Sequence, residues 1–403
     1  MDDQIYYQRN KNRLKQIVQI IKSYDFSLPL NVFLRNIYLD NKNMGSNDRR
    51  HISNIFYQYL RLGTNLQDIE TEKKIGVALF LCNNGDMPFS FHVISEFTTF
   101  NPKDIELPLR EKFDIVMQEF PDFMIEKIFP LSRYFSKTID KDLFIESNLF
   151  QPKVWIRIKR GKKEEVIQEI KDYGFDYAEA EFSELCFSFI RHYPLHQFKN
   201  YLNGNFEIQD AGSQLTGTYF KPNPNEDWWD VCAGSGGKSL MLIDEDPTVS
   251  IYATDIRKSV LENLKIRFSK AGFHNIETET IDVSNTFVIT NPYESFDGII
   301  LDAPCTGSGT WAAIPENLSL FDYKSISEQH HLQTQIGQNV LPYLKKGKPL
   351  IYITCSVYKQ ENEDAVKFLC DNFNLHLESQ QIIEGYKFGA STFFVARMIK
   401  KEL

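Results

Sequence analysis

Two cysteines and one aspartate stand directly after apolar segments of strand length. Asp302 and Cys305 belong to LDAPCTGSG, and Cys355 belongs to YITCS. The carboxyl ends of neighbouring parallel strands meet at one edge of a sheet, where ligands bind. A free cysteine is usually a small buried hydrophobe, but two thiols and a carboxylate at that edge favour a chemical role.

The chemistry that these groups suit is attack on a pyrimidine. Carbon 5 of cytosine is a poor nucleophile until a thiolate adds at carbon 6, which makes carbon 5 enamine-like and able to take a methyl group. A base then removes the carbon 5 proton, and the thiolate leaves. The carboxyl group of Asp302 could hydrogen-bond the Watson–Crick edge of the base. Such a reaction needs an unstacked base, in single-stranded or flipped-out nucleic acid.

The two thiols differ in their predicted surroundings. An ordinary thiol with a pKa of ~8.5 is only about 3% thiolate at pH 7. Asp302 lies shortly before Cys305, so its charge would oppose a thiolate there. Cys355 directly precedes VYKQENEDAVKFL, which we interpret as a helix whose N-terminal dipole would favour an anion. Cys355 is therefore the predicted nucleophile.

A glycine-rich loop, DVCAGSGGKSL at residues 230–240, follows one apolar strand and opens a helix. Glycines let a ligand approach the backbone, and a helix N-terminus favours an anion. Cys232 stands where a P-loop needs glycine, and Ser239 breaks the dinucleotide pattern. Asp255 and Asp282 end the next two strands, where carboxylates can meet the ribose and the amino group of an adenosine-type ligand. Either aspartate could instead cap a helix.

The net charge of −9 argues against a nucleic-acid partner, yet the basic residues are clustered. Residues 1–61 hold ten Lys and Arg against five Asp and Glu, and residues 151–163 hold six basic residues and no acidic one. In residues 154–159 apolar side chains alternate with Trp155 and basic ones, as in a half-buried strand with a basic outer face. Such clusters are phosphate-facing surfaces or ordinary solvated faces, and the pattern alone leaves both open.

Length and periodicity divide the chain into three predicted domains. With 403 residues it is too long for one hydrophobic core. Apolar residues spaced by three and four indicate a helical domain over residues 1–140, and a short alternating segment indicates an α/β module over 141–205. Apolar strands alternating with helices indicate a parallel sheet over 206–403.

The composition argues against several other classes. We find no apolar run long enough to span a bilayer, and the first residues lack the apolar core of a secretory signal. Six dispersed cysteines without a CxxC pair argue against a disulfide scaffold and a zinc ribbon. We therefore expect no metal and a cytoplasmic location.

Together these motifs resemble the RsmB/Nop/Sun family of S-adenosylmethionine-dependent RNA (cytosine-5) methyltransferases. DVCAGSGGKS is similar to its cofactor loop, and DAPCTGSG and TCS are similar to its paired-cysteine motifs. GSNDRRHISNIFYQYLR resembles a segment of its helical NusB-like domain, QPKVWIRIK its RRM-like module and QDAGSQLTG the entry to its catalytic domain. The resemblance implies a class I (Rossmann-like) methyltransferase with a doubly wound α/β sheet, preceded by those two modules.

The resemblance also implies roles for individual residues. Cys355 would be the nucleophile and Cys305 would assist product release, while Asp302 would orient the base. The residues expected to bind S-adenosyl-L-methionine are Cys232, Ala233, Gly234, Ser235, Gly236, Gly237, Lys238, Asp255, Asp282 and Asp302. The residues expected to contact RNA are Arg49, Arg50, Lys153, Arg157, Lys159 and Arg160.

Three departures from the family pattern bear on substrate binding. The loop has Gly234 and Ser235 where the family usually has Ala-Pro. Ala312 and Ala313 stand where a pair of arginines is common, and the strand of the RRM-like module ends in IRIK, where asparagine is common. These changes affect the expected affinity for RNA more than the expected chemistry.

The predicted function is transfer of a methyl group from S-adenosylmethionine to carbon 5 of a cytosine in RNA, through a covalent Cys355 adduct. Ribosomal RNA is the expected substrate, transfer RNA is the alternative, and the protein is expected to act as a monomer. A second hypothesis is a catalytically inactive RNA-binding assembly factor, which the missing arginines favour and the intact Asp302, Cys305 and Cys355 oppose. A small-molecule methyltransferase would leave the two N-terminal domains unexplained.

Overall fold

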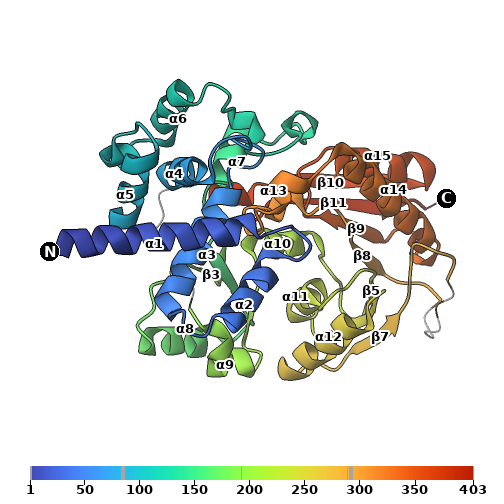
Figure 1. Ribbon diagram of the computed structural model, residues 1–403. Helices are drawn as coiled ribbons and strands as arrows, with labels where there is room; N and C mark the ends of the chain where they lie inside the picture. The colour runs from blue at the N-terminus through green and yellow to red at the C-terminus, as the bar shows by residue number, and fades with distance from the viewer. Residues whose placement is uncertain (1, 83–86, 192, 288, 290–293, 403) are drawn as a thin grey trace. The chain divides into compact units, whose positions relative to one another are not determined.

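The three-and-four spacing of apolar residues in the first third of the chain produces helices, as predicted (Figure 1). The structure, a computed structural model, describes residues 2–82, 87–191, 193–287, 289 and 294–402. Two compact units are present, and each is described by itself. The first contains residues 1–133, 140–151 and 311–322, and the second contains residues 134–139, 152–310 and 323–403.

The first unit is built from helices around α4 (Thr71–Cys82), whose residues from Lys74 onward are all buried. A helix that is covered on every side belongs in a core, and α3 and α5 pack against it. On α3, Ile52, Ile55 and Phe56 form the buried stripe that the sequence spacing predicts. The other helices of this unit are α1 (Asp2–Lys22), α2 (Leu30–Asp40), α3 (Ser46–Leu60), α5 (Met87–Phe97), α6 (Leu109–Glu119), α7 (Lys141–Ser147) and α13 (Asn317–Leu320).

A segment from late in the chain belongs to this helical unit. Residues 311–322 fall in the range predicted for the parallel-sheet domain, yet Trp311 stacks on Phe129 with ring centroids 5.2 Å apart. The backbone N–H of Leu30 donates to the carboxylate of Glu316 at 3.0 Å. These contacts join residues that are far apart in sequence, so local periodicity could not reveal them. The segment includes the two alanines that replace the expected arginines.

The second unit contains two sheets, of which the smaller has the strand order β2-β3-β1-β4 with antiparallel pairs. Its elements follow a β-α-β-β-α-β order, a split βαβ arrangement. On one face, Ile156 and Ile158 of β1 belong to an apolar cluster with Val166 and Ile170 of α8. The elements are β1 (Val154–Ile158), α8 (Lys163–Asp172), β2 (Ala178–Ala180), β3 (Ser183–Phe189), α9 (Lys199–Leu202) and β4 (Phe206–Ile208).

The opposite face of β1 is also covered. Trp155 is 5% exposed, its indole N–H donates to the carbonyl of Gly389 at 3.1 Å, and its ring packs edge-on against Phe388. Arg157 on the same face forms an ion pair with Asp244. The expectation of a basic outer face is therefore wrong for these two β1 residues, because residues from the C-terminal part of the unit pack on it.

The larger sheet has seven strands in the order β10-β11-β9-β8-β5-β6-β7. Strands β5 to β9 pair in parallel, as predicted, and β10 and β11 complete the other edge as antiparallel strands. The strands are β5 (Asp227–Asp230), β6 (Ser250–Asp255), β7 (Ile276–Thr280), β8 (Gly298–Asp302), β9 (Pro349–Thr354), β10 (Leu375–Ile383) and β11 (Phe393–Lys400).

Helices cover this sheet and place its functional edge. α11 and α12 pack beside β6 and β7, and α15 packs against β10 and α14 (Figure 1). The parallel strands β5, β6 and β7 run outward on one side, and β8 and β9 run outward on the other, so the chain order reverses between β5 and β8. Ligands of open α/β sheets bind at such a switch point. The helices are α10 (Ala211–Thr216), α11 (Gly237–Glu245), α12 (Lys258–Lys270), α14 (Tyr323–Val340) and α15 (Glu363–Asn372).

None of the helices in the described ranges combines the length and the apolar character needed to cross a bilayer.

Candidate active site

The large sheet brings Cys305 and Cys355 together. Asp302 is the last residue of β8, Cys355 follows the last residue of β9, and the two strands pair in parallel. The Sγ atoms of the two cysteines are 3.4 Å apart. The loops are also joined through the backbone, because the N–H of Gly309 donates to the carbonyl of Cys355 at 2.8 Å. A base that reaches this edge can therefore meet both thiols.

The two thiols are not equivalent. The hydrogen bond with Cys355, burial and the negative charge of Glu361 together raise the pKa of the Cys305 thiol well above its ordinary value. Cys305 therefore stays protonated at neutral pH and can donate a hydrogen bond to a Cys355 thiolate. In the structure Cys355 and Glu361 oppose a thiolate at Cys305, in place of the predicted Asp302.

The helix predicted directly after Cys355 begins later. α15 begins at Glu363, so Cys355 does not lie at its N-terminus and the predicted dipole effect is wrong. The intervening loop is irregular because Asn362 folds back on it. The amide of Asn362 donates to the carbonyl of Ser356 at 3.0 Å, and its Oδ1 accepts from the hydroxyl of Thr354 at 2.6 Å.

Glu361, which the sequence reasoning missed, holds both cysteine loops. Glu361 is fully buried. One carboxylate oxygen accepts from the backbone N–H of Thr306 at 2.8 Å, and the other accepts from the hydroxyls of Thr306, at 2.7 Å, and Ser356. Thr306 follows Cys305 and Ser356 follows Cys355, so one carboxylate fixes the residue after each thiol. Burial raises the pKa of Glu361.

Asp302 forms an ion pair with Lys238 of α11. The Nζ atom of Lys238 lies 2.8 Å from Asp302 Oδ2 and donates to the hydroxyl of Ser213 at 2.9 Å. The Lys238 side chain is 7% exposed and the Asp302 side chain is 32% exposed. Lys238 is therefore buried, whereas Asp302 is partly accessible. The sequence predicted both residues as cofactor ligands, and the structure joins them to each other.

The glycine loop, residues 231–236, connects β5 to α11 and holds half of the predicted cofactor residues. Gly234 and Gly236 have positive φ angles of 54° and 83°, which favour glycine. A Cβ at Gly236 would lie 2.6 Å from the side chain of Leu264, so a larger residue does not fit. A Cβ at Gly234 would meet only Arg257, at 4.0 Å. The Gly234 side of the loop is therefore open to a ligand. Cys232, in the same loop, is not a reactive thiol at neutral pH, because burial raises its pKa.

Asp255 and Asp282 stand where the sequence predicted ribose and adenine contacts. Asp255 ends β6, and its Oδ2 accepts from the backbone N–H of Gly234 at 3.0 Å. Burial opposes ionisation of Asp255, but hydrogen bonds from Arg257 and Gly234 outweigh it and lower its pKa. Asp282 accepts from the hydroxyl and the backbone N–H of Ser284, which also lower its pKa. Both carboxylates are ionised and already hold local turns.

Asp230, at the end of β5, is a second residue that the sequence reasoning missed. It is 1% exposed, and its Oδ2 accepts from the hydroxyl of Ser239 at 2.6 Å. Its Oδ1 atom has no hydrogen-bond partner among the described residues. Burial raises the pKa of Asp230 to about 7. This unpartnered oxygen is therefore enclosed directly before the glycine loop.

The basic residues of β1 that were predicted to contact RNA are largely engaged within the unit. Arg157 lies 3.0 Å from Asp244 and its side chain is 13% exposed. The Nζ atom of Lys159 donates to the carbonyl of Ala271. Arg160, just beyond the strand, is exposed. The geometry thus favours a structural role for Arg157 and Lys159 and leaves Arg160 accessible.

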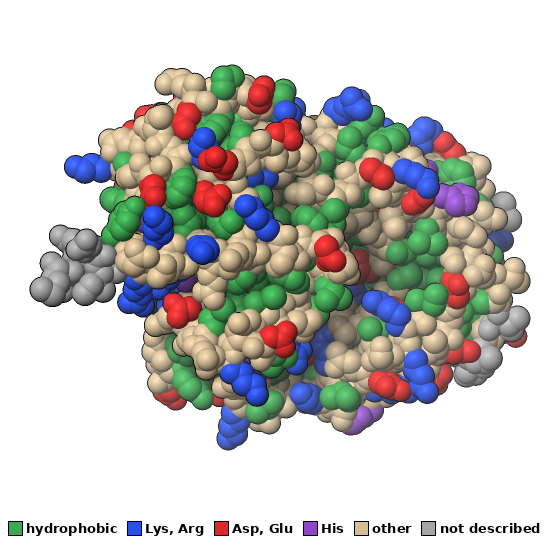
Figure 2. Space-filling view, viewed as in Figure 1, with side chains coloured by type: hydrophobic (Ala, Val, Ile, Leu, Met, Phe, Trp, Pro, Cys, Tyr) green, Lys and Arg blue, Asp and Glu red, His purple; other side chains and the backbone are tan. Residues whose placement is uncertain are grey.

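The remaining predicted RNA contacts lie elsewhere. Arg50 is exposed on α3, and the guanidinium of Arg49 lies 5.8 Å from the ring centroid of Tyr38. The Nζ atom of Lys153 lies 5.6 Å from the ring centroid of Trp155. On the face shown in Figure 2, Lys and Arg side chains are interspersed with Asp and Glu. RNA contact by these residues stays a prediction.

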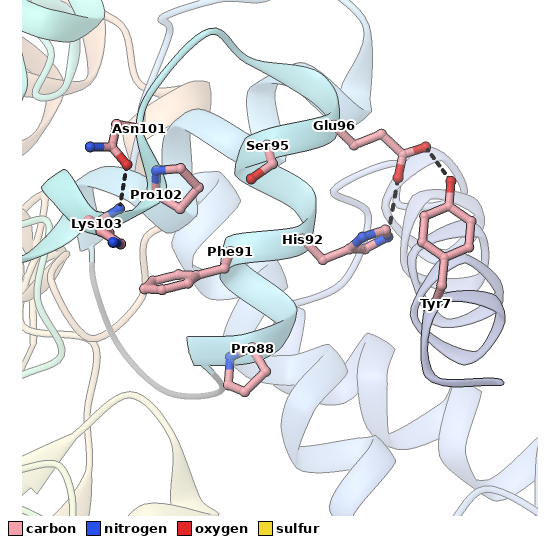
Figure 3. A pocket seen from close by; sticks show the side chains of 9 residues that line it. All are labelled: Tyr7, Pro88, Phe91, His92, Ser95, Glu96, Asn101, Pro102 and Lys103. Atoms are coloured by element: carbon pink, nitrogen blue, oxygen red, sulfur yellow. Dashed lines mark hydrogen bonds and ion pairs between the residues drawn. The ribbon is translucent and has the colours of Figure 1, made fainter. Parts of the chain in front are cut away.

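A separate pocket of about 600 Å³ lies in the helical unit, between α1, α5 and the short helix Pro102–Glu106 (Figure 3). The hydroxyl of Tyr7 donates to Glu96 at 3.5 Å, and His92 lies 3.2 Å from the same carboxylate. The residues that line the pocket are Tyr7, Pro88, Phe91, His92, Ser95, Glu96, Asn101, Pro102 and Lys103. None of these was a predicted site residue.

Comparison with known proteins gives a family match for the C-terminal part of the chain. Residues 217–400 match the family model described as 16S rRNA methyltransferase RsmB/F. Ribosomal RNA small subunit methyltransferase B of Escherichia coli O157:H7 (strain EC4115 / EHEC) is 28% identical over 276 residues, which cover 64% of this chain and 62% of that protein. The chain thus aligns with less than two thirds of the length of such relatives.

Solved structures share the fold. The crystal structure of PH0851 covers 96% of this chain and 98% of that chain, with a TM-score of 0.71 and 20% identity. The structure of NSun6 from Pyrococcus horikoshii with SFG covers 68% of this chain and 98% of that chain, with a TM-score of 0.60 and 18% identity. The predicted fold class, a Rossmann-like methyltransferase sheet with a helical N-terminal region, is confirmed. The RRM-like character of the small module stays a prediction.

Proposed function

From the membership of its residues 217–400 in the RsmB/F family of methyltransferases, we propose that the protein transfers a methyl group to carbon 5 of a cytosine in RNA. The observation that carries the proposal is the 3.4 Å contact between the Sγ atoms of Cys305 and Cys355. Methylation at carbon 5 needs one thiol that adds to the ring and a second group that assists its departure. Two thiols in contact supply both.

Cys355 is the nucleophile in this proposal. Its thiolate forms a bond to carbon 6, and the electron pair of the 5,6 double bond becomes available at carbon 5. After the methyl group is in place, the carbon 5 proton is lost to water, the double bond re-forms and the Cys355 sulfur leaves. Cys305, kept as a thiol by its surroundings, donates a hydrogen bond to the departing thiolate. This assigns release of the product to Cys305.

Asp302 orients the base. Its ion pair with Lys238 fixes one oxygen, and its exposed side can accept a hydrogen bond from the amino group of cytosine. Glu361 positions the reacting thiols through Thr306 and Ser356. These contacts keep the two loops in place, so that little reorganisation is needed when the base arrives.

The surroundings of the glycine loop fit S-adenosylmethionine, which when bound supplies an electrophilic methyl group. The open side of Gly234, the unpartnered oxygen of Asp230 and the carboxylate of Asp255 lie at or next to this loop. Residues 232–238 with Asp255 and Asp282 would hold the cofactor. The Arg257 side chain, which is 64% exposed, would turn away from Asp255 to free it for the ribose. A solved neighbour with SFG, an S-adenosylmethionine analogue, supports this choice.

Ribosomal RNA is the proposed substrate. The name of the Escherichia coli relative, Ribosomal RNA small subunit methyltransferase B, supports ribosomal over transfer RNA. Such a substrate would place the protein in the cytoplasm.

The test is methyl transfer from tritiated S-adenosylmethionine to RNA from a strain that lacks the protein. We expect label in ribosomal RNA, recovered as 5-methylcytidine, and bisulfite sequencing should locate the position. Cys355→Ala should abolish transfer. Label in another nucleoside, or full activity of Cys355→Ala, would contradict the proposal. Cofactor binding without transfer to any cellular RNA would favour the assembly-factor hypothesis.

A further inference from the structure

Arg267 of α12 connects the glycine loop to the small sheet. Its Nη1 donates to the carbonyl of Ser235 and, at 2.9 Å, to the Ser235 hydroxyl. Its Nη2 and Nε donate to one carboxylate oxygen of Glu207 on β4, at 2.8 and 3.2 Å. The side chains of Arg267 and Glu207 are 19% and 14% exposed. Three guanidinium nitrogens thus hold the loop and the small sheet at once.

The glycine loop needs external support. Ser235 lies between Gly234 and Gly236, both in the left-handed region of φ. Glycines have the largest backbone freedom to lose when a loop becomes ordered. A proline between them would restrict the chain, but this sequence has serine there. Serine does not restrict the backbone as proline would. The two hydrogen bonds from Arg267 to Ser235 restrain the loop instead.

A second connection reaches the first residue of α11, directly after the loop. Gln209 follows β4, and its Oε1 accepts from the Nε of Arg157 on β1 at 2.9 Å. The amide of Gln209 donates to the carbonyl of Gly237 at 3.4 Å. Arg157 is itself paired with Asp244 on α11, the helix that the loop opens. The small sheet therefore contacts the loop at Ser235, through Arg267, and the start of α11 at Gly237.

We propose that Arg267 is a positioning residue for the glycine loop and that Glu207 makes the small sheet part of the loop's support. The affinity of the loop for its ligand then depends on a contact outside the ligand site. The inference deepens the proposed function, on which it rests, because it takes S-adenosylmethionine as the ligand. It also assigns the small sheet a role in cofactor binding that is separate from any contact with RNA.

The test is titration calorimetry of the full chain with S-adenosylhomocysteine and S-adenosylmethionine. Arg267→Met should weaken binding about tenfold and Glu207→Gln about threefold, since hydrogen bonds to charged groups are lost. In turnover assays Arg267→Met should raise the KM for S-adenosylmethionine while kcat at saturation holds. Arg267→Lys, which reaches one partner but not both, should give an intermediate value.

The matched control is Arg397→Met. Arg397 is similarly buried, at 12% exposed, and pairs with Glu378 at 2.8 Å on the antiparallel edge of the large sheet. It should leave cofactor affinity unchanged. Wild-type affinity in folded Arg267→Met or in Glu207→Gln, or an equal loss in Arg397→Met, would overturn the inference. Absence of binding by the wild-type protein would instead overturn the proposed function.

Discussion

Two sets of buried ionisable side chains lie in the second unit. One set is stabilised by hydrogen bonds from neutral groups and the other by an ion pair. At the functional edge of the large sheet, Glu361 and Asp230 accept hydrogen bonds from hydroxyl groups. On β1 of the small sheet, Arg157 lies against the opposite charge of Asp244. Burial raises the pKa of Asp244 as well as those of Glu361 and Asp230. The positive charge of Arg157 is the main contribution that opposes the rise at Asp244, whereas a hydroxyl hydrogen bond has that role at Glu361 and at Asp230.

The difference separates positions that serve chemistry from positions that serve packing. Glu361 bears on the reacting thiols because its charge raises the pKa of Cys305 and its hydrogen bonds hold the residue after each cysteine. Arg157 cancels a charge inside the unit and fixes the small sheet against α11. Basic residues in a sequence cannot be divided between these roles until it is known what covers them.

The largest expected effect is on the ion pair. Arg157→Ala leaves Asp244 buried without its partner, which should lower the free energy of unfolding by about 3–5 kcal/mol. Chemical denaturation measures it. The double variant Arg157→Met with Asp244→Leu should recover most of the loss, because an apolar pair of similar volume avoids the unpaired charge. A loss below about 1 kcal/mol for Arg157→Ala would mean that the pair behaves like a surface salt bridge.

The sequence predicted one of these regions better than the other, for a topological reason. Asp302, Cys305 and Cys355 directly follow apolar strands, and parallel pairing brings such strand ends to one edge without further information. The alternation in β1 correctly indicated a strand, but the partners of Trp155 and Arg157 come from distant parts of the chain.

Two other features needed the three-dimensional structure. The sequence predicted a helix that included Glu361, but α15 begins only at Glu363. Glu361 lies in the loop before this helix, and side-chain hydrogen bonds such as that from Asn362 to Ser356 fix the loop. Trp311 and its neighbours join the helical unit through Phe129, a contact that has no local sequence signal.

A second effect concerns Glu361, the carboxylate that joins the two cysteine loops. Glu361→Gln keeps the shape but loses acceptors for the hydroxyls of Thr306 and Ser356, which should lower the free energy of unfolding by about 2–3 kcal/mol and reduce turnover. It also removes a negative charge, so the pKa of Cys305 should fall. Alkylation of Cys305 followed by mass spectrometry across pH measures this. An unchanged alkylation profile would show that Glu361 has only a structural role.

A third effect is the pH dependence from Asp230. Its pKa is about 7 in the folded protein and near 3.8 when unfolded, so its contribution to stability is complete below pH 4 and is lost as pH rises to 7. Relative to wild type, Asp230→Asn should gain about 1.4 kcal/mol of stability per pH unit between pH 5 and 6.5. Denaturation at several pH values measures the difference. A constant difference would mean that Asp230 is ionised in the folded state.

The smallest effect concerns RNA. Arg160 is exposed, unlike Arg157, so Arg160→Ala should reduce the slope of log affinity against log salt concentration by about one. Filter binding across salt concentrations measures the slope, and the exposed Lys265 of α12 provides a control in Lys265→Ala. An unchanged slope for Arg160→Ala would show that the cluster at 151–163 is a solvated surface, and it would leave the chemistry at the cysteines unaffected.

The central claim is that Cys355 forms the bond to cytosine and Cys305 releases it. The direct measurement is electrophoresis in SDS after incubation with RNA and S-adenosylmethionine. Cys305→Ala should accumulate a slowly migrating protein–RNA adduct that SDS does not disrupt, while Cys355→Ala and the double variant should form none. An adduct in Cys355→Ala or in the double variant, or equal methyl transfer by Cys355→Ala and wild type, would contradict the account.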